Sequence, residues 1–241
     1  MKVQLKAKQQ QGFTIIELVV VILLLGILAA TALPRFLDVT EEAHDAVVDG
    51  TASALQTGVA LYRAQWIAQQ QPAAGTVLSS TEFGGLVIGT AGYPIGVTNS
   101  STGLFNATAA NSEAQCVEIY NGLLQAGRAP VSGSALTTAD TDVPESPTAS
   151  TAESATNSDF FGISQGFVAK QVEGVTSIGD LAANSLAAAD EFCVYAYVAD
   201  ANRRSTVDDA VPAIVYFPNA TTGTATAARF EAGSVVQTVL L

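Results

Sequence analysis

The sequence predicts an α+β protein in which one long amino-terminal helix packs on an antiparallel β-sheet. Three observations lead to this fold class. An apolar run near the amino terminus is long enough for a helix that crosses a membrane. Helical spacing of apolar residues continues well beyond that run. The carboxyl-terminal part contains runs of β-branched and aromatic residues separated by polar turns, which is the pattern of strands.

The apolar run extends from Phe13 to Leu33 and contains a single charged residue, Glu17. As a helix it would be roughly 31 Å long, which is enough to cross the hydrocarbon core of a bilayer. The only charges before the run are positive, those of Lys2, Lys6 and Lys8. The positive-inside rule therefore predicts a single-pass precursor with a cytoplasmic amino terminus. A carboxylate inside such a span costs about 3 kcal/mol, so Glu17 is a candidate functional residue.

Apolar residues continue to recur every three or four positions beyond Pro34, as far as about Gln70. Pro72 cannot continue a helix, so we expect one helix over about residues 13–70. Residues 35–71 would form an amphipathic half that packs on a globular head. The stripe expected to be buried consists of Phe36, Val39, Ala43, Val47, Ala54, Gly58, Tyr62 and Trp66. The single histidine, His44, falls among acids on the opposite, solvated face, and we expect no ligand there.

Residues 72–241 are expected to form the globular head. Its first part is rich in glycine turns, with a short strand over residues 86–88 and a short helix over residues 111–125. Residues 131–158 are poor in large apolar side chains, which predicts an exposed, low-complexity insertion. Residues 160–190 form a stretch of mixed polar and apolar residues, in which we expect a helix near residues 180–189. Strands are expected over residues 192–198, 213–217 and 234–241.

The charge balance argues against a nucleic-acid partner. Three of the 10 basic residues and none of the 22 acidic residues precede Phe13, so the rest of the chain has 7 basic and 22 acidic residues, a net charge of −15. The two cysteines, Cys116 and Cys193, fit one disulfide formed in an oxidising compartment, with two buried free thiols as the alternative.

We expect no enzyme, because most motifs of catalytic sites are missing from the sequence. These include phosphate-binding loops, the H-E-x-x-H zinc motif and C-x-x-C. One histidine is too few for most His-based triads or metal clusters. We therefore expect no catalytic residue, no metal and no cofactor.

The stretch from Lys8 to Leu37 resembles the class III signal of type IV prepilins, on the strength of its basic leader, Gly12-Phe13 and Glu17 at a fixed distance before a span-length apolar run. The resemblance implies a type IV pilin fold and removal of residues 1–12 by a prepilin peptidase, which cuts after Gly12 and N-methylates Phe13. Glu17 would then pair with the new Phe13 amine of a neighbouring subunit as the helices of residues 13–34 form a filament core.

Gly26 and Pro34 have low helix propensity and favour a kink between them. The resemblance implies that this segment loosens when the subunit leaves the membrane for the filament. A simple bend is the alternative, because glycine and proline are common in membrane helices.

Motifs in the head resemble the pilins of the mannose-sensitive haemagglutinin (MSHA) system, in particular its accessory, MshB-like members. These motifs are Pro34–Thr40, Arg63–Trp66, Gly92–Pro94 and Cys116–Asn121. The implied function is a structural subunit of an MSHA-like pilus that supports adhesion. Its implied partners are other pilins, the prepilin peptidase and the inner-membrane assembly platform. The precursor would lie in the inner membrane and the product in an extracellular pilus.

Four alternatives remain open. A pseudopilin of type II secretion shares the same amino terminus, and a tip-located minor pilin could act as an adhesin. An ordinary secretory signal would be cut near Ala30-Thr31-Ala32 and leave Leu33 first. The last alternative is a plain membrane anchor in which Glu17 occurs by chance.

Overall fold

The computed structural model describes residues 13–79, 81–97, 112–124, 131–133, 166–172, 191–197, 199, 211–220 and 230–240. Its internal contacts divide the chain into two units, Met1–Ala43 and His44–Leu241. The predicted α+β class is confirmed, with a long first helix and a sheet formed mainly by the carboxyl-terminal part. The leader of residues 1–12, most of the insertion and the helix expected near residues 180–189 lie outside the described residues.

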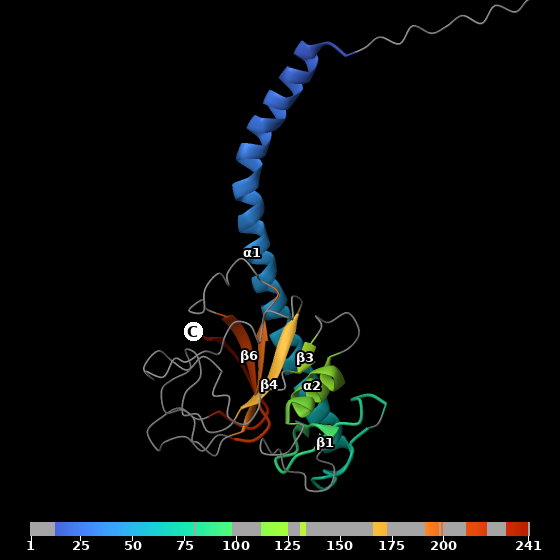
Figure 1. The fold of residues 1–241 in the computed structure, drawn as a ribbon. Helices are drawn as coiled ribbons and strands as arrows, with labels where there is room; N and C mark the ends of the chain where they lie inside the picture. Colours follow the sequence, from blue (N-terminus) through green and yellow to red (C-terminus); the bar gives the residue numbers. More distant parts are fainter. Residues whose placement is uncertain are drawn as a thin grey trace, which may run out of the picture. The chain divides into compact units, whose positions relative to one another are not determined.

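The first unit contains the beginning of α1 (Ile15–Ala68), drawn in blue in Figure 1. The large apolar side chains from Phe13 to Leu33 are between 40 and 88 % exposed, so the described part of the chain does not cover them. By length and composition, Ile15–Leu33 can cross a membrane. The backbone stays α-helical through Gly26 and Pro34.

The second unit contains a five-stranded sheet in the order β3-β4-β5-β6-β7. The strands are β3 (Val131–Gly133), β4 (Phe167–Val172), β5 (Phe192–Tyr197), β6 (Val211–Phe217) and β7 (Ser234–Leu240). The last three are the strands predicted from sequence. All neighbours are antiparallel except β3, which pairs in parallel with β4. The sheet is therefore mixed at one edge and not wholly antiparallel.

Two of these strands correct the expectations from sequence. β3 occupies the first three residues of the stretch expected to be an exposed insertion, and Val131 packs against the core. β4 lies within residues 160–190, where the sequence predicts a helix and no strand. Both strands are stabilised by pairing with each other, and β4 also pairs with β5 over six residues. Pairing between distant segments leaves little trace in the local pattern of a strand.

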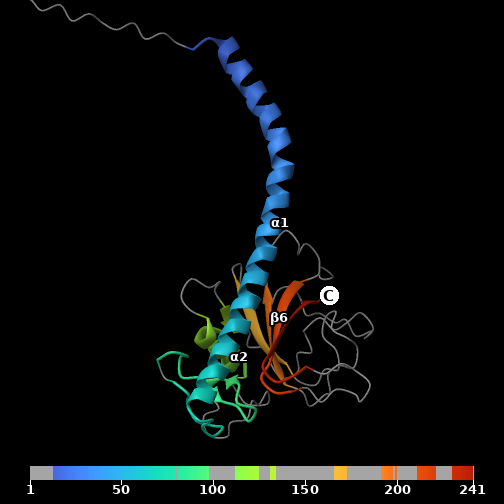
Figure 2. The same cartoon turned by 180° about the vertical axis from the view of Figure 1, so that it is seen from behind.

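A short hairpin and a second helix complete the described part of the head. The hairpin consists of β1 (Val87–Ile88) and β2 (Pro94–Ile95), and the helix is α2 (Ser112–Leu123), close to the predicted 111–125. The main core lies where these elements and the second part of α1 meet one face of the sheet. Figure 2 shows α1 crossing in front of the strands, whereas the strands lie in front of it in Figure 1.

The buried stripe of α1 has the predicted period but a different phase. Its members are Val48, Ala52, Leu55, Val59 and Tyr62. Several residues that the sequence analysis placed inside are exposed, namely Phe36, Val39, Ala43, Val47 and Ala54. Neighbouring positions in a helix can satisfy the same period, and the face that is buried carries the larger Leu55 and Val59, which remove more apolar area from water.

His44 also differs from its expected place on a solvated face. Its side chain is half-buried, with Nδ1 2.8 Å from the hydroxyl oxygen of Tyr197 and the two ring centroids 5.6 Å apart. His44 is the first residue of the second unit. Within that unit it joins α1 to β5.

The opposite face of the sheet is buried as well. Phe192, Val215 and Phe217 are fully or almost fully buried in a second apolar cluster, and Phe230 stacks on Phe217 with ring centroids 4.7 Å apart. All six residues of β5 are buried, which explains why its sequence is a continuous apolar run and not an alternating one.

Gly58 of α1 lies against Leu123 at the end of α2. A Cβ atom there would lie 2.9 Å from the carbonyl oxygen of Leu123, whereas a Cβ atom on Gly50 of the same helix would meet nothing within 4 Å. We expect Gly58→Ala to lower the free energy of unfolding by about 1–3 kcal/mol, because the two helices must move apart. Gly50→Ala is the matched control and should raise it by roughly 0.5–1 kcal/mol, the ordinary gain of alanine in a helix.

Urea unfolding of the full-length chain in detergent micelles measures both substitutions. Equal effects at the two glycines would contradict the close packing of α1 on α2.

Candidate functional site at the start of α1

A reciprocal set of hydrogen bonds closes the first turn of α1. The Thr14 amide donates to Oε2 of Glu17 over 3.0 Å, and the Thr14 hydroxyl donates to the same oxygen over 2.7 Å. The Glu17 amide donates to Oγ1 of Thr14 over 3.3 Å. Thr14 is the residue before Ile15, where α1 begins, and its carbonyl oxygen accepts from Leu18 N at 3.3 Å. The arrangement is a capping box with Thr14 as N-cap.

The sequence signal for this capping box is Thr-x-x-Glu ahead of an apolar run, which the charge pattern alone does not reveal. The box gives Glu17 a local role beside the predicted ion pair: its carboxylate stabilises the start of the helix and sits near the positive end of the helix dipole. The charge of Glu17 is thus partly compensated within its own chain.

The other residues predicted at this site are placed as follows. Gly12 lies outside the described residues, so the scissile bond itself is not seen. Phe13 is outside the helix and 88 % exposed, next to the capping residue. Gly26 lies within α1, and a Cβ atom there would meet nothing within 4 Å. The predicted pair of Glu17 with a Phe13 amine joins two chains, so it stays a prediction.

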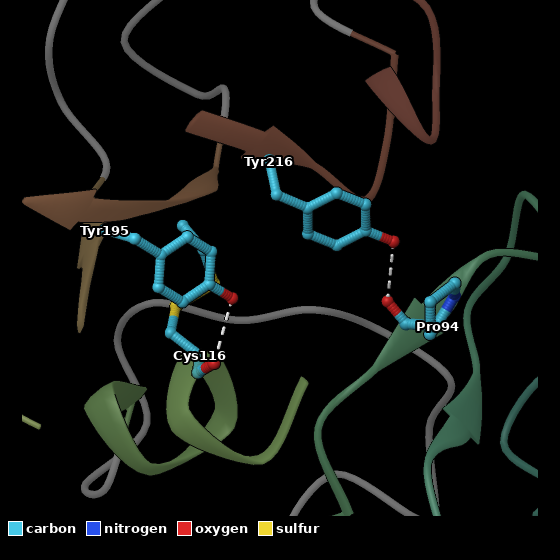
Figure 3. Close-up of a disulfide and its surroundings, with 5 residues drawn as sticks. Pro94, Cys116, Tyr195 and Tyr216 are labelled. Atoms are coloured by element: carbon cyan, nitrogen blue, oxygen red, sulfur yellow. Dashed lines mark hydrogen bonds between the residues drawn. A yellow bond between two sulfur atoms is a disulfide. The ribbon is translucent and has the colours of Figure 1, made fainter. Parts of the chain in front are cut away.

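The two cysteines form the disulfide expected from sequence and tie α2 to β5. Cys116 on α2 and Cys193 on β5 have Cα atoms 5.6 Å apart and are separated by 77 positions. Figure 3 shows the Tyr195 hydroxyl donating to the carbonyl oxygen of Cys116 over 2.9 Å beside the bridge. The Tyr216 hydroxyl donates to the carbonyl oxygen of Pro94 over 2.9 Å. Two tyrosines of the sheet therefore hold α2 and β2 by their backbones.

Burial raises the pKa of Tyr62, Tyr195 and Tyr216 above the ordinary tyrosine value of about 10. The folded state then keeps these protons at a pH where the unfolded chain releases them. These three tyrosines therefore leave the free energy of unfolding unchanged below pH about 10. Above that pH they lower it, by up to about 1.4 kcal/mol per pH unit for each tyrosine. We expect the thermal midpoint to drop steeply between about pH 10 and 11.

Thermal unfolding from about pH 8 to 11 checks this, with Tyr216→Phe as the comparison. Because a phenylalanine side chain cannot ionise, the variant should show a shallower alkaline slope. An unchanged alkaline slope in the variant would show that Tyr216 does not contribute to the loss of stability at high pH.

Arg63, near the end of α1, contacts residues of the loop between β1 and β2. Its guanidinium carbon lies 4.0 Å from the ring centroid of Trp66 and 4.8 Å from that of Tyr93. One of its nitrogens donates to the carbonyl oxygen of Ala91 over 2.7 Å. Gly92, in the loop between β1 and β2, has a φ of 77° and packs under Arg63 and Trp66. The end of α1 is thereby fixed to that loop.

Among the residues that the structure describes, no three His, Cys, Asp or Glu side chains come together as a metal site. At the start of α1, the polar groups of Thr14 and Glu17 are hydrogen-bonded to each other, and the Glu17 carboxylate can also pair with a cation.

Comparison with known proteins finds the prokaryotic N-terminal methylation motif at residues 7–33. The type IV narrow pilus major component PilA5 of Thermus thermophilus is 43 % identical over 74 residues, 31 % of this chain and 62 % of the relative. The type II secretion system core protein G of Pseudomonas aeruginosa is 36 % identical over 59 residues, 24 % of this chain and 42 % of the relative.

A third relative, the type IV major alpha-pilin of Moraxella bovis, is 46 % identical over 50 residues, 21 % of this chain and 31 % of the relative. The chain spans less than two thirds of the length of each of these relatives. No solved structure matches the chain.

Proposed function

We propose that the chain is a structural subunit of a type IV pilus, because its amino-terminal region matches the prokaryotic N-terminal methylation motif and is similar to type IV pilins. The prepilin peptidase would cut after Gly12 and methylate the new amino terminus at Phe13. The subunits would then polymerise through the apolar part of α1.

One observation carries this proposal: the methylation motif includes the start of a helix whose apolar side chains find no cover within the described part of the chain. Such a surface must be buried in lipid or against other apolar helices. A membrane supplies the first environment and a bundle of identical helices the second. A filament subunit that is extracted from the membrane needs both.

Glu17 would set the axial offset between neighbouring helices in the filament core. Cleavage at Gly12 would create a cationic amine at Phe13, and methylation leaves it able to stay charged. Unit charges about 4 Å apart attract by about 4 kcal/mol at an effective dielectric constant of about 20. This attraction is comparable with the cost of about 3 kcal/mol for a lone carboxylate in the membrane. Pairing Glu17 of one chain with the Phe13 amine of another would therefore favour one axial offset between helices.

We also propose that the pilus is of the MSHA-like kind and supports adhesion. The resemblance of the head motifs suggests this, and the packing of Arg63 on Trp66 and Tyr93 supports treating two of those motifs as one structural unit. The precursor would be a single-pass inner-membrane protein that engages the peptidase, the assembly platform and other pilins. The mature subunit would lie in an extracellular pilus.

A pseudopilin of type II secretion is the second candidate, and the similarity to a type II secretion core protein favours it. Such a subunit would share the processing and the Glu17 pairing but would build a short periplasmic fibre. The location of the polymer separates the two functions.

Mass spectrometry of filaments sheared from the cell surface tests the proposal. We expect this chain to be abundant there, to begin at N-methylated Phe13 and to contain the Cys116–Cys193 disulfide. A chain that begins at Leu33, or one with Phe13 first but confined to the periplasm, would overturn the surface-pilus function. The first result would support a secretory signal and the second a pseudopilin.

A further inference from the structure

Both donors of Thr14 converge on one oxygen of Glu17. The amide and the hydroxyl of Thr14 each donate to Oε2, at 3.0 and 2.7 Å. The hydroxyl oxygen of Thr14 also accepts from the Glu17 amide at 3.3 Å. One hydroxyl can make both bonds because it has one proton to donate and two lone pairs to accept with. These contacts fix the Glu17 side chain against the first turn of its own helix.

The second carboxylate oxygen, Oε1, is left open. Within the described stretch from Phe13 onward, no residue donates a hydrogen bond to it. An ionised carboxylate has about four acceptor positions on its two oxygens, so Oε1 retains its full capacity to accept from a cation. The capping box and an intermolecular ion pair are therefore compatible on the same side chain.

We propose that Thr14 is a positioning residue for assembly: it holds Oε2 of Glu17 so that Oε1 is presented in one orientation to the amine of a second copy of this chain. The inference rests on the proposed function as a filament subunit. A glutamate on an exposed helix surface ordinarily samples many rotamers, and forming an ion pair would have to stop that motion. Here the chain restricts the side chain before the partner arrives, and this preorganisation favours association.

Four threonine variants test the role of Thr14. Thr14→Ser keeps the donor and the cap, whereas Thr14→Val keeps the shape and loses both. Thr14→Gly is the informative variant, because glycine is about as good an N-cap as threonine but has no hydroxyl to donate. The matched control is Thr31→Val in the same apolar helix, whose hydroxyl donates to the Leu28 carbonyl oxygen over 3.0 Å, far from Glu17.

The readout is the fraction of each variant recovered in sheared filaments when it is the only copy, with a Phe13 terminus verified by mass spectrometry. We expect Thr14→Ser and Thr31→Val to assemble like the unmodified chain. Thr14→Val and Thr14→Gly should lose at least about tenfold, the factor that corresponds to one hydrogen bond to a charged group. Normal assembly of Thr14→Gly with a loss in Thr14→Val would overturn the proposal in favour of simple helix capping.

Glu17→Gln, tested in parallel, separates this inference from the function it rests on. If Glu17→Gln fails to assemble while Thr14→Gly assembles normally, the ion pair stands and the positioning role of Thr14 falls. If the unmodified chain forms no filament, the proposed function falls and the role of Thr14 falls with it.

Discussion

A chain with Glu17→Ala as the only copy is expected to insert and to be cleaved after Gly12, but to yield at least about tenfold less filament than the unmodified chain. The variant loses the attraction between Glu17 and the Phe13 amine, about 4 kcal/mol before the cost of desolvating the two charges is subtracted. A net loss of only about 1.4 kcal/mol already corresponds to a factor of ten. Filament yield per cell-associated subunit measures the effect.

The capping box makes a second substitution necessary to interpret this result. Alanine removes both the charge of Glu17 and the bonds from Thr14, whereas Glu17→Gln removes the charge and keeps an acceptor that suits a capping box. We expect Glu17→Gln to assemble as poorly as Glu17→Ala. Normal piliation by the glutamine variant would show that capping, and not an ion pair with Phe13, is what assembly requires.

Removing the disulfide is expected to cost about 4 kcal/mol of the free energy of unfolding, because the bridge closes a loop of 77 positions in the unfolded chain. The double variant Cys116→Ala, Cys193→Ala should still fold. The Tyr195 hydroxyl donates to the backbone of residue 116, a bond that the substitution leaves in place. Urea unfolding under oxidising conditions should show a lower midpoint, and the unmodified chain under reducing conditions should behave in the same way.

A further substitution, Tyr195→Phe, tests whether the hydrogen bond and the bridge act on the same contact. In the chain without the disulfide, Tyr195→Phe should lower the free energy of unfolding more than in the bridged chain, because the hydrogen bond then holds α2 to β5 without the covalent link. Equal costs in the two backgrounds would mean that the two ties are independent. An unchanged urea midpoint without the bridge would contradict the stabilising role of the disulfide itself.

The described start of α1 carries signals that can be read from sequence. A methylation motif, an apolar run and Thr-x-x-Glu are local patterns, because the atoms that interact are within four residues of one another. Local patterns of apolar residues also predict the helix over residues 15–68 and the strands at residues 192–197 and 234–240. Helix α2 was recognisable from one apolar face that also carries Cys116.

The head was predicted less well where distant segments decide the outcome. β3 and β4 are strands because they pair with each other and with β5, and the intervening sequence gives no sign of that pairing. His44 was assigned to solvent from its acidic neighbours, yet Tyr197, 153 positions away, is its hydrogen-bond partner. The phase of the buried stripe was also missed, because Val47 and Val48 fit one helical period equally well.

Short-range spacing and apolar periodicity are enough to predict the long first helix, its span-length apolar run and the place of Glu17 within it. Contacts between distant segments are needed to select which face of α1 is buried, the order of the five strands, and the place of Arg63 between Trp66 and Tyr93. The physical reason is that close packing selects one arrangement among several that the local pattern allows equally. Glu17 belongs to both categories: its place in the chain is local information, and the closed capping box with one open oxygen is a fact of three-dimensional geometry.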